Sequence, residues 1–125
     1  MSNGVAEKKR VLVVDDNPKL MNFMQLGLKF AGFEAVTADS GICALEAVRS
    51  NSLDIILLDI RMPDMDGFEV LRRLRKFSQI PVIAYSATPE YLTPALESGA
   101  NAFLAKPFDM DQLTELINKL ADHQE

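Results

Sequence analysis

Among the charged and hydroxyl side chains of this 125-residue sequence, five have the types and the spacing from which a catalytic or metal site could be built. Three are carboxylates, Asp15, Asp16 and Asp59, one is the hydroxyl of Ser86, and one is the ammonium of Lys106. Taken singly, each has an ordinary explanation, because an Asp often caps a helix and a Lys is usually solvated. All five follow short apolar runs, however, and this shared placement predicts that they act together.

The sequence around them alternates short apolar runs with longer stretches of helical periodicity. The runs predict strands at 11–14, 33–37, 53–58, 81–84 and 102–104, and the longer stretches predict helices within 18–31, 40–50, 68–74, 88–99 and 109–120. Helix starts are indicated by Asn17-Pro18, by Thr88-Pro89-Glu90, and by Asp109 with Gln112 as a capping box. Five strand–helix units in succession predict an α/β fold, a doubly wound parallel sheet with helices on both faces.

In such a fold, ligands bind beyond the carboxyl ends of the strands. The five side chains should therefore converge at one edge of the sheet. Three carboxylates gathered there would repel one another unless a cation lay between them. A hard cation that takes oxygen ligands and keeps several waters fits best, which predicts Mg²⁺, with Mn²⁺ as the alternative.

A carboxylate beside a divalent cation, an ammonium and a hydroxyl is suited to accepting a phosphoryl group. Asp59 would attack in line while the cation and Lys106 neutralise the phosphoryl oxygens, and Ser86 would donate a hydrogen bond to the product. No general base is needed, because a carboxylate is already ionised near neutral pH.

Composition narrows the classes of protein further. There are 13 Lys and Arg against 18 Asp and Glu, a net charge of −5, which argues against a direct nucleic-acid binder. One cysteine, Cys43, excludes an internal disulfide and a Cys-based zinc site and fits a reducing compartment. The apolar runs are too short for a membrane span, and no signal peptide precedes them. We therefore expect a cytoplasmic protein with a flexible lead-in at 1–9 and one domain at 10–122.

Four sequence blocks, in this order and spacing, resemble the signature blocks of the response regulator receiver domain of two-component signalling. They are Val11-Leu12-Val13-Val14-Asp15-Asp16, the run Leu57–Gly67, the run Pro81–Ala87, and Lys106-Pro107-Phe108. The resemblance covers residues 9–121. It implies a flavodoxin-like fold with strand order 2-1-3-4-5, and a signalling phosphoprotein that promotes its own magnesium-dependent phosphorylation and dephosphorylation rather than an enzyme acting on external substrates.

The resemblance also implies roles for individual residues. Asp59 would be the phosphoacceptor, charged from a phosphohistidine on a sensor kinase or a histidine phosphotransfer protein. Asp16 would ligate Mg²⁺ directly and Asp15 through water, with Asp59 and the backbone carbonyl of Arg61 completing the protein ligands. Lys106 would contact the phosphoryl group, and its bond to Pro107 would be cis.

The switch that the resemblance implies involves two further positions. The phosphoryl group would draw Ser86 towards it, and Phe103 would then turn inward, although Phe103 stands where the family more often has Tyr. The output surface would be the helix at 88–99, the strand at 102–104 and the helix at 109–120, where phosphorylation-dependent dimerisation is one alternative. In this family Arg61 and Thr88 occupy positions that tune the lifetime of the phosphoryl group.

Two rival functions fail on specific residues. A phosphatase of the haloacid dehalogenase type needs a second acid two residues after the nucleophile, where this chain has Arg61. A flavodoxin-like FMN carrier needs a phosphate-binding loop after the first strand, where Asp15 and Asp16 would repel a phosphate. One alternative stays open, since the chain could be a free-standing receiver or a piece of a hybrid sensor kinase or a transcription regulator.

Overall fold

A computed structural model describes residues 8–121 of the chain. Most of the expected lead-in (residues 1–7) and residue 122 of the expected domain lie outside the described residues. The strands are β1 (Arg10–Val14), β2 (Glu34–Ala38), β3 (Ile55–Asp59), β4 (Val82–Ser86) and β5 (Ala102–Ala105). The helices are α1 (Pro18–Phe30), α2 (Gly41–Ser50), α3 (Gly67–Leu74), the 3₁₀ turn η1 (Pro89–Tyr91), α4 (Leu92–Ser98) and α5 (Met110–Ala121).

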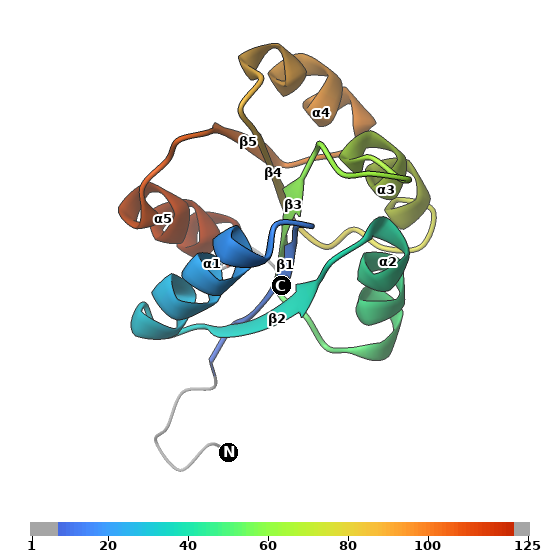
Figure 1. Ribbon diagram of the computed structural model, residues 1–125. Helices are drawn as coiled ribbons and strands as arrows, with labels where there is room; N and C mark the ends of the chain where they lie inside the picture. The colour runs from blue at the N-terminus through green and yellow to red at the C-terminus, as the bar shows by residue number, and fades with distance from the viewer. Residues whose placement is uncertain (1–7, 122–125) are drawn as a thin grey trace.

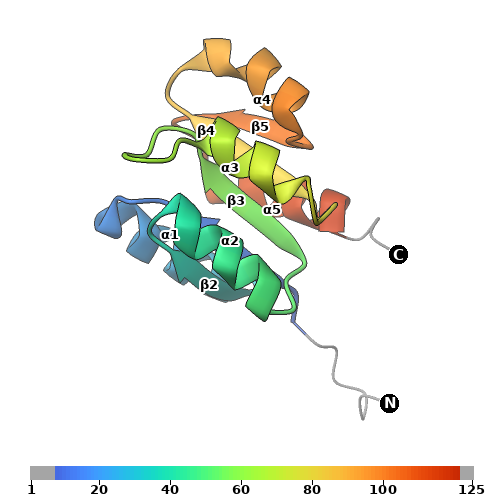
Figure 2. The same ribbon diagram turned by 90° about the vertical axis from the view of Figure 1, so that its right-hand side faces the viewer.

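The five strands form one parallel sheet in the order β2-β1-β3-β4-β5, as the sequence analysis predicted. Helices α1 and α5 cover one face, and α2, α3 and α4 cover the other (Figure 1). Figure 2 looks onto the second face, with α2 and α3 in front of the sheet. Strands buried on both faces carry continuous apolar runs, which is why β1, β3 and β4 are almost entirely inaccessible to solvent.

The side chains of β4 and of the neighbouring strands point alternately to the two faces of the sheet, and this divides the core into two clusters. Val82 and Ala84 face α2–α4 together with Phe103, whereas Ile83 and Tyr85 face α1 and α5. Successive side chains of a strand point to opposite faces, so neighbouring residues of β4 serve different layers. No helix within the described range 8–121 is long and apolar enough to cross a membrane.

Two helix starts agree with the sequence analysis. Asn17 accepts hydrogen bonds from the amides of Lys19 and Leu20 at the start of α1, with Pro18 in the first position. At the start of α5, the amide of Gln112 donates to Asp109 Oδ1 at 2.7 Å, and the amide of Asp109 donates to Gln112 Oε1 at 3.1 Å. These reciprocal bonds form the predicted capping box.

The segment at 88–99 differs from the expected single helix. Thr88 makes no side-chain cap, and its amide instead donates to Ser86 Oγ at 3.1 Å. A 3₁₀ turn therefore precedes α4, and Pro94, which has no amide hydrogen, lies in the first turn of α4. Strand β4 also runs to Ser86, two residues beyond the expected end, so Ser86 closes the strand rather than following it.

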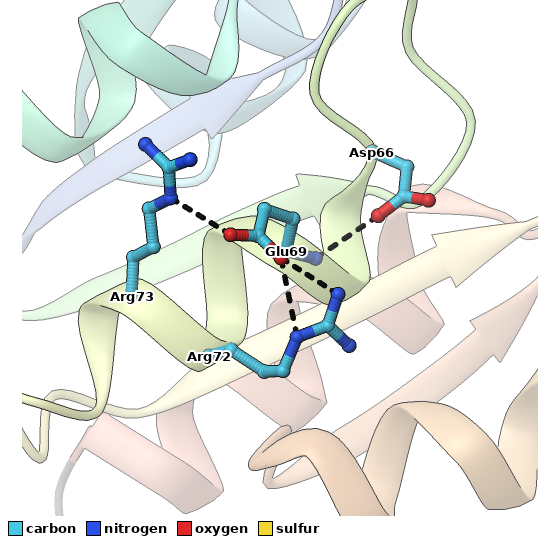
Figure 3. A network of polar contacts seen from close by, with 4 residues as sticks. All are labelled: Asp66, Glu69, Arg72 and Arg73. Carbon is cyan, nitrogen blue, oxygen red and sulfur yellow. Dashed lines mark hydrogen bonds and ion pairs between the residues drawn. The ribbon is translucent and has the colours of Figure 1, made fainter.

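Helix α3 is anchored by a polar network at its start (Figure 3). Asp66 accepts a hydrogen bond from the amide of Glu69, and Glu69 accepts hydrogen bonds from the guanidinium groups of Arg72 and Arg73. The hydrogen bonds from Arg73 and then Arg72 lower the pKa of Glu69. The positive charges of Arg72 and Arg73, in the last turn of α3, are therefore partly neutralised within their own helix.

Gly67 brings the start of α3 against the end of β3. Its amide donates to the carbonyl of Ile60 at 2.8 Å. A Cβ at position 67 would lie 2.8 Å from Ile60 Cα and 3.0 Å from the carbonyl oxygen of Asp59. Because these are backbone atoms, the contact cannot be relieved by turning a side chain.

We expect Gly67→Ala to lower the free energy of unfolding by about 2 kcal/mol, because an added methyl group would push apart two packed backbones. Gly27→Ala is the matched control, since a Cβ there meets only the flexible end of Met110. Alanine inside α1 should leave stability unchanged or raise it by up to about 1 kcal/mol. Urea denaturation of both variants tests this prediction, and equal effects of the two substitutions would contradict it.

Candidate functional site

The fold brings the five chemically competent side chains to one edge of the sheet. Asp59 is the last residue of β3 and Ser86 the last of β4, while Asp15 and Asp16 follow β1 and Lys106 follows β5. Because the strands are parallel, their carboxyl ends lie together. The predicted convergence is therefore present.

The three carboxylates form a compact acidic cluster. Asp15, Asp16 and Asp59 each offer an oxygen, and these oxygens lie within 4.8 Å of one another. Asp15 is 1% exposed and Asp59 5% exposed, whereas Asp16 is open to solvent. Two buried acids and one exposed acid, all with oxygen donors, suit a hard divalent cation that keeps part of its water shell.

The electrostatics of Asp59 support this fit. Burial, and then the charge of Asp15, raise the pKa of the Asp59 carboxyl from 3.8 to about 6. Lys106 and the amide of Arg61 act in the opposite direction, and Asp16 adds a smaller upward contribution. The cluster thus holds more negative charge than its cationic neighbours compensate, which is the condition that a bound cation relieves.

The two carboxylate oxygens of Asp59 differ in their contacts with the described part of the chain, because Oδ1 accepts a hydrogen bond from it and Oδ2 does not. Oδ1 accepts a hydrogen bond from the amide of Arg61 at 3.2 Å and lies 3.8 Å from Lys106 Nζ. Oδ2 accepts no hydrogen bond from any residue within 8–121. Tethering of Oδ1 orients the carboxylate, so that Oδ2 is available as a nucleophile or ligand.

Ser86 and Lys106 are held to each other through the backbone. The amide of Lys106 donates to the carbonyl of Ser86 at 2.9 Å, and the Lys106–Pro107 peptide bond is cis. The side chain of Ser86 is buried, and its Oγ accepts from the amide of Thr88. Its hydroxyl proton is therefore free to be donated elsewhere.

Two further residues that the sequence analysis singled out are Phe103 and Arg61. Phe103 is half-buried on β5, pairs with Ala84 of β4, and lies on the α4 face of the sheet. By alternation Ser86 faces the same side as Ala84, so Ser86 and Phe103 share one layer. The side chain of Arg61 is exposed, and its backbone contacts Asp59.

Tyr85 was given no role in the sequence analysis, yet it is part of this site. Its hydroxyl donates to Asp15 Oδ2 at 2.7 Å, and its ring lies 5.0 Å from Lys106 Nζ. Burial, and then Asp15, hold the pKa of Tyr85 above its ordinary value, so the hydroxyl stays a donor. A Tyr inside a buried apolar run was the available signal, because its hydroxyl needs a partner. The partner is 70 residues away in sequence.

Comparison with known proteins agrees with this geometry. A family model for the response regulator receiver domain matches residues 11–118 of the chain. The transcriptional regulatory protein KdpE of Mycobacterium tuberculosis is 38% identical over 104 residues, which are 82% of this chain and 46% of KdpE. The chain thus spans about half the length of this curated relative.

Solved structures give the same result. The receiver domain of the Francisella response regulator 1452 matches with a TM-score of 0.88 and 34% identity, over 94% of this chain and 100% of that one. The receiver domain of the sensor histidine kinase PA1611 from Pseudomonas aeruginosa PAO1 was solved with magnesium coordinated in its active site cleft. It matches with a TM-score of 0.85 and 27% identity, over 93% of this chain and 99% of that one. The chain therefore belongs to the response regulator receiver domain family of two-component signalling proteins.

Proposed function

We propose that this receiver accepts a phosphoryl group on Asp59, in a Mg²⁺-dependent transfer from a phosphohistidine of a sensor kinase or a histidine phosphotransfer protein. The observation that carries the proposal is the setting of Asp59, a buried carboxylate within reach of two further acids and 3.8 Å from an ammonium. A nucleophilic carboxylate, an ammonium group and a hydroxyl donor thus lie at the same edge of the sheet.

The proposed transfer is a displacement at phosphorus. Asp59 Oδ2 attacks in line, an oxygen–phosphorus bond forms, and the nitrogen–phosphorus bond of the phosphohistidine breaks with its electron pair left on the imidazole. Lys106 neutralises charge on the phosphoryl oxygens, and the hydroxyl of Ser86 donates to one of them in the product. When bound, the divalent cation supplies positive charge beside the same oxygens.

The residues suited to hold that cation are Asp16, Asp15 and Asp59, with the backbone carbonyl of Arg61 as a further ligand. Support comes from the mutual approach of the carboxylate oxygens and from the raised pKa of Asp59. Mg²⁺ is the proposed occupant because the PA1611 receiver holds this ion in its active site cleft. Mn²⁺, which prefers the same oxygen ligands, is the alternative.

A protein donor fits the surface next to Lys106. An apolar cavity of about 430 Å³ is lined by α1 and by the segment after β5, including Met24, Lys106 and Phe108. Phe23 of α1 lines it too and is 58% exposed. An exposed aromatic ring in the same cavity as Lys106 is suited to docking a partner helix or loop.

The output is proposed to pass from Ser86 through Phe103 to the surface formed by α4, β5 and α5. Ser86 and Phe103 lie on the face of the sheet that α4 covers. Leu92 and Leu96 of α4 are both 44% exposed, which gives that surface apolar area for a partner. Phosphorylation would shift an equilibrium between two conformations of this layer. A homodimer that forms through the surface of α4, β5 and α5 is one form of the output.

The rest of the signalling pathway depends on what this receiver is joined to. KdpE is a transcriptional regulator and PA1611 a sensor histidine kinase, so both a downstream protein partner and an effector domain of the same chain are compatible outputs. The net charge of −5 favours a protein partner over direct nucleic-acid contact. We place the protein in the cytoplasm, because the exposed thiol of Cys43 fits a reducing compartment.

Incubation with Mg²⁺ and phosphoramidate, a small donor with a nitrogen–phosphorus bond, should add one phosphoryl group, as read by intact mass. Asp59→Asn should abolish the adduct, because it removes the nucleophilic oxygen. Asp64→Asn is the matched control, since Asp64 is an exposed acid of the same loop with a φ of 71°, which Asn tolerates. An adduct of equal yield on Asp59→Asn would refute the assignment of Asp59.

Removing the charge of Asp59 should stabilise the metal-free protein at alkaline pH. The pKa of Asp59 in the folded protein is about 6, above the ordinary 3.8, so folding favours the protonated carboxyl. The stability that this preference provides is complete below pH 3.8 and is lost as the pH rises through 6. In chelator at about pH 8, Asp59→Asn should raise the free energy of unfolding by about 2 kcal/mol, and at about pH 4 by far less.

Urea denaturation with and without Mg²⁺ measures this effect. Saturating Mg²⁺ should stabilise the wild type more than Asp59→Asn, because the variant offers one carboxylate fewer. Glu115→Gln, which removes an exposed charge from α5, is the control and should show no such pH dependence. If Asp59→Asn were less stable than the wild type in chelator at alkaline pH, the prediction would be contradicted.

Ser86→Ala and Phe103→Ala should uncouple phosphorylation from the α4 surface. Both should still form the adduct, while the change in amide hydrogen exchange of α4 on phosphorylation should be largely lost, because each removes one step of the proposed relay. Ser50→Ala, an exposed position on α2, is the control and should behave as the wild type. If either variant kept the full exchange response, the relay would run by another route.

A further inference from the structure

Asp15 is held at both of its oxygens by groups of the protein. The amide of Asn17 donates to Oδ1 at 2.9 Å, and the hydroxyl of Tyr85 donates to Oδ2 at 2.7 Å. Asp15 is also buried, and its own amide is bonded to the carbonyl of Ala38 at 3.1 Å. The carboxylate plane is therefore determined before any cation binds.

Tyr85 is itself enclosed by the core and contacted on several sides. It is fully buried between α1 and α5, its ring packs edge-on against Phe108 with centroids 5.6 Å apart, and its carbonyl accepts a hydrogen bond from the amide of Ile60 at 3.1 Å. Lys106 Nζ lies over the same ring. One side chain thus connects Asp15 of the acidic cluster with the lysine that faces Asp59.

We propose that Tyr85 is a positioning residue that makes the acidic site selective for Mg²⁺ over Ca²⁺, by holding Asp15 in a single orientation. This inference rests on the proposed metal site. Hydrogen bonds to the second oxygen of a carboxylate fix how it can approach an ion, and removing such outer contacts commonly weakens metal binding 10- to 100-fold.

The direction of selectivity follows from the two ions. Mg²⁺ demands near-octahedral geometry at about 2.0–2.1 Å and keeps several waters, whereas Ca²⁺ accepts 6–8 oxygens at about 2.3–2.6 Å, often with a bidentate carboxylate. While both Asp15 oxygens are tethered, the carboxylate cannot rotate to chelate the larger ion with both of them. Without the Tyr85 hydroxyl, Oδ2 is released and that rotation becomes available.

The test is calorimetric titration of Mg²⁺ and of Ca²⁺ into the unphosphorylated full chain, comparing wild type with Tyr85→Phe, which keeps the ring and removes only the hydroxyl. We expect the Kd for Mg²⁺ to rise about tenfold and the Kd for Ca²⁺ to stay constant or fall, so that the preference for Mg²⁺ drops at least tenfold. Tyr91→Phe is the matched control, since Tyr91 packs against Phe68, and it should change neither constant.

Each outcome is decisive. An unchanged or tighter Mg²⁺ affinity in Tyr85→Phe overturns the inference, and so does an equal loss for both ions, which a general disturbance of the core would produce. Absence of Mg²⁺ binding by the wild type would instead refute the proposed metal site itself. The two failures are thereby distinguished.

A measurement on the wild type covers the case in which Tyr85→Phe does not fold. With ¹³C at the tyrosine Cζ positions, the chain gives two signals, which Tyr91→Phe assigns. Mg²⁺ should shift the Tyr85 signal with the midpoint found by calorimetry and leave the Tyr91 signal in place. A Tyr85 signal that does not move at saturating Mg²⁺ would overturn the inference.

Discussion

Mutual repulsion among Asp15, Asp16 and Asp59 is the constraint on which the site depends. Their oxygens lie within 4.8 Å of one another, and two of the three residues are buried. The pKa of Asp59 rises to about 6 because burial and Asp15 outweigh the opposing effect of Lys106. Carboxylates held this close together favour the binding of a cation. In the proposed transfer, the phosphoryl group reaches Asp59 only when the divalent cation is bound there.

The surrounding fold keeps these groups close against their repulsion. Parallel pairing of β1, β3 and β4 aligns their carboxyl ends, and buried apolar runs on both faces hold the strands in register. Backbone amides add local tethers, from Asn17 to Asp15 and from Arg61 to Asp59. The close approach of Gly67 to the end of β3 serves the same purpose, since any larger residue there would displace the backbone at Ile60, next to Asp59.

The alternation of β4 separates two tasks that adjoining residues perform. Tyr85 faces α1 and α5 and holds Asp15, whereas Ser86 belongs to the layer of Phe103 and α4. In the two proposals taken together, Tyr85 orients Asp15 before phosphorylation, and Ser86 transmits the effect of phosphorylation to the α4 layer. The apolar cavity by α1 and the exposed Leu92 and Leu96 of α4 then lie on opposite faces of the sheet.

Much of this could be predicted from the sequence, because the signals are local or periodic. Apolar runs and helix caps such as Asn17 depend on neighbouring residues, and the strand-end position of Asp15, Asp59 and Lys106 follows from them. Two predictions went wrong where contacts that the sequence pattern does not show decide the structure. Thr88 makes no side-chain cap, and its amide instead bonds to Ser86 Oγ two residues earlier. Strand β4 extends to Ser86 because β5, a later segment of the chain, pairs with it there. The role of Tyr85 depends on a partner 70 residues away. Residue types and order therefore determined which chemistry is present, while tertiary structure alone decided which oxygens are tethered, since that depends on distances between strands far apart in sequence.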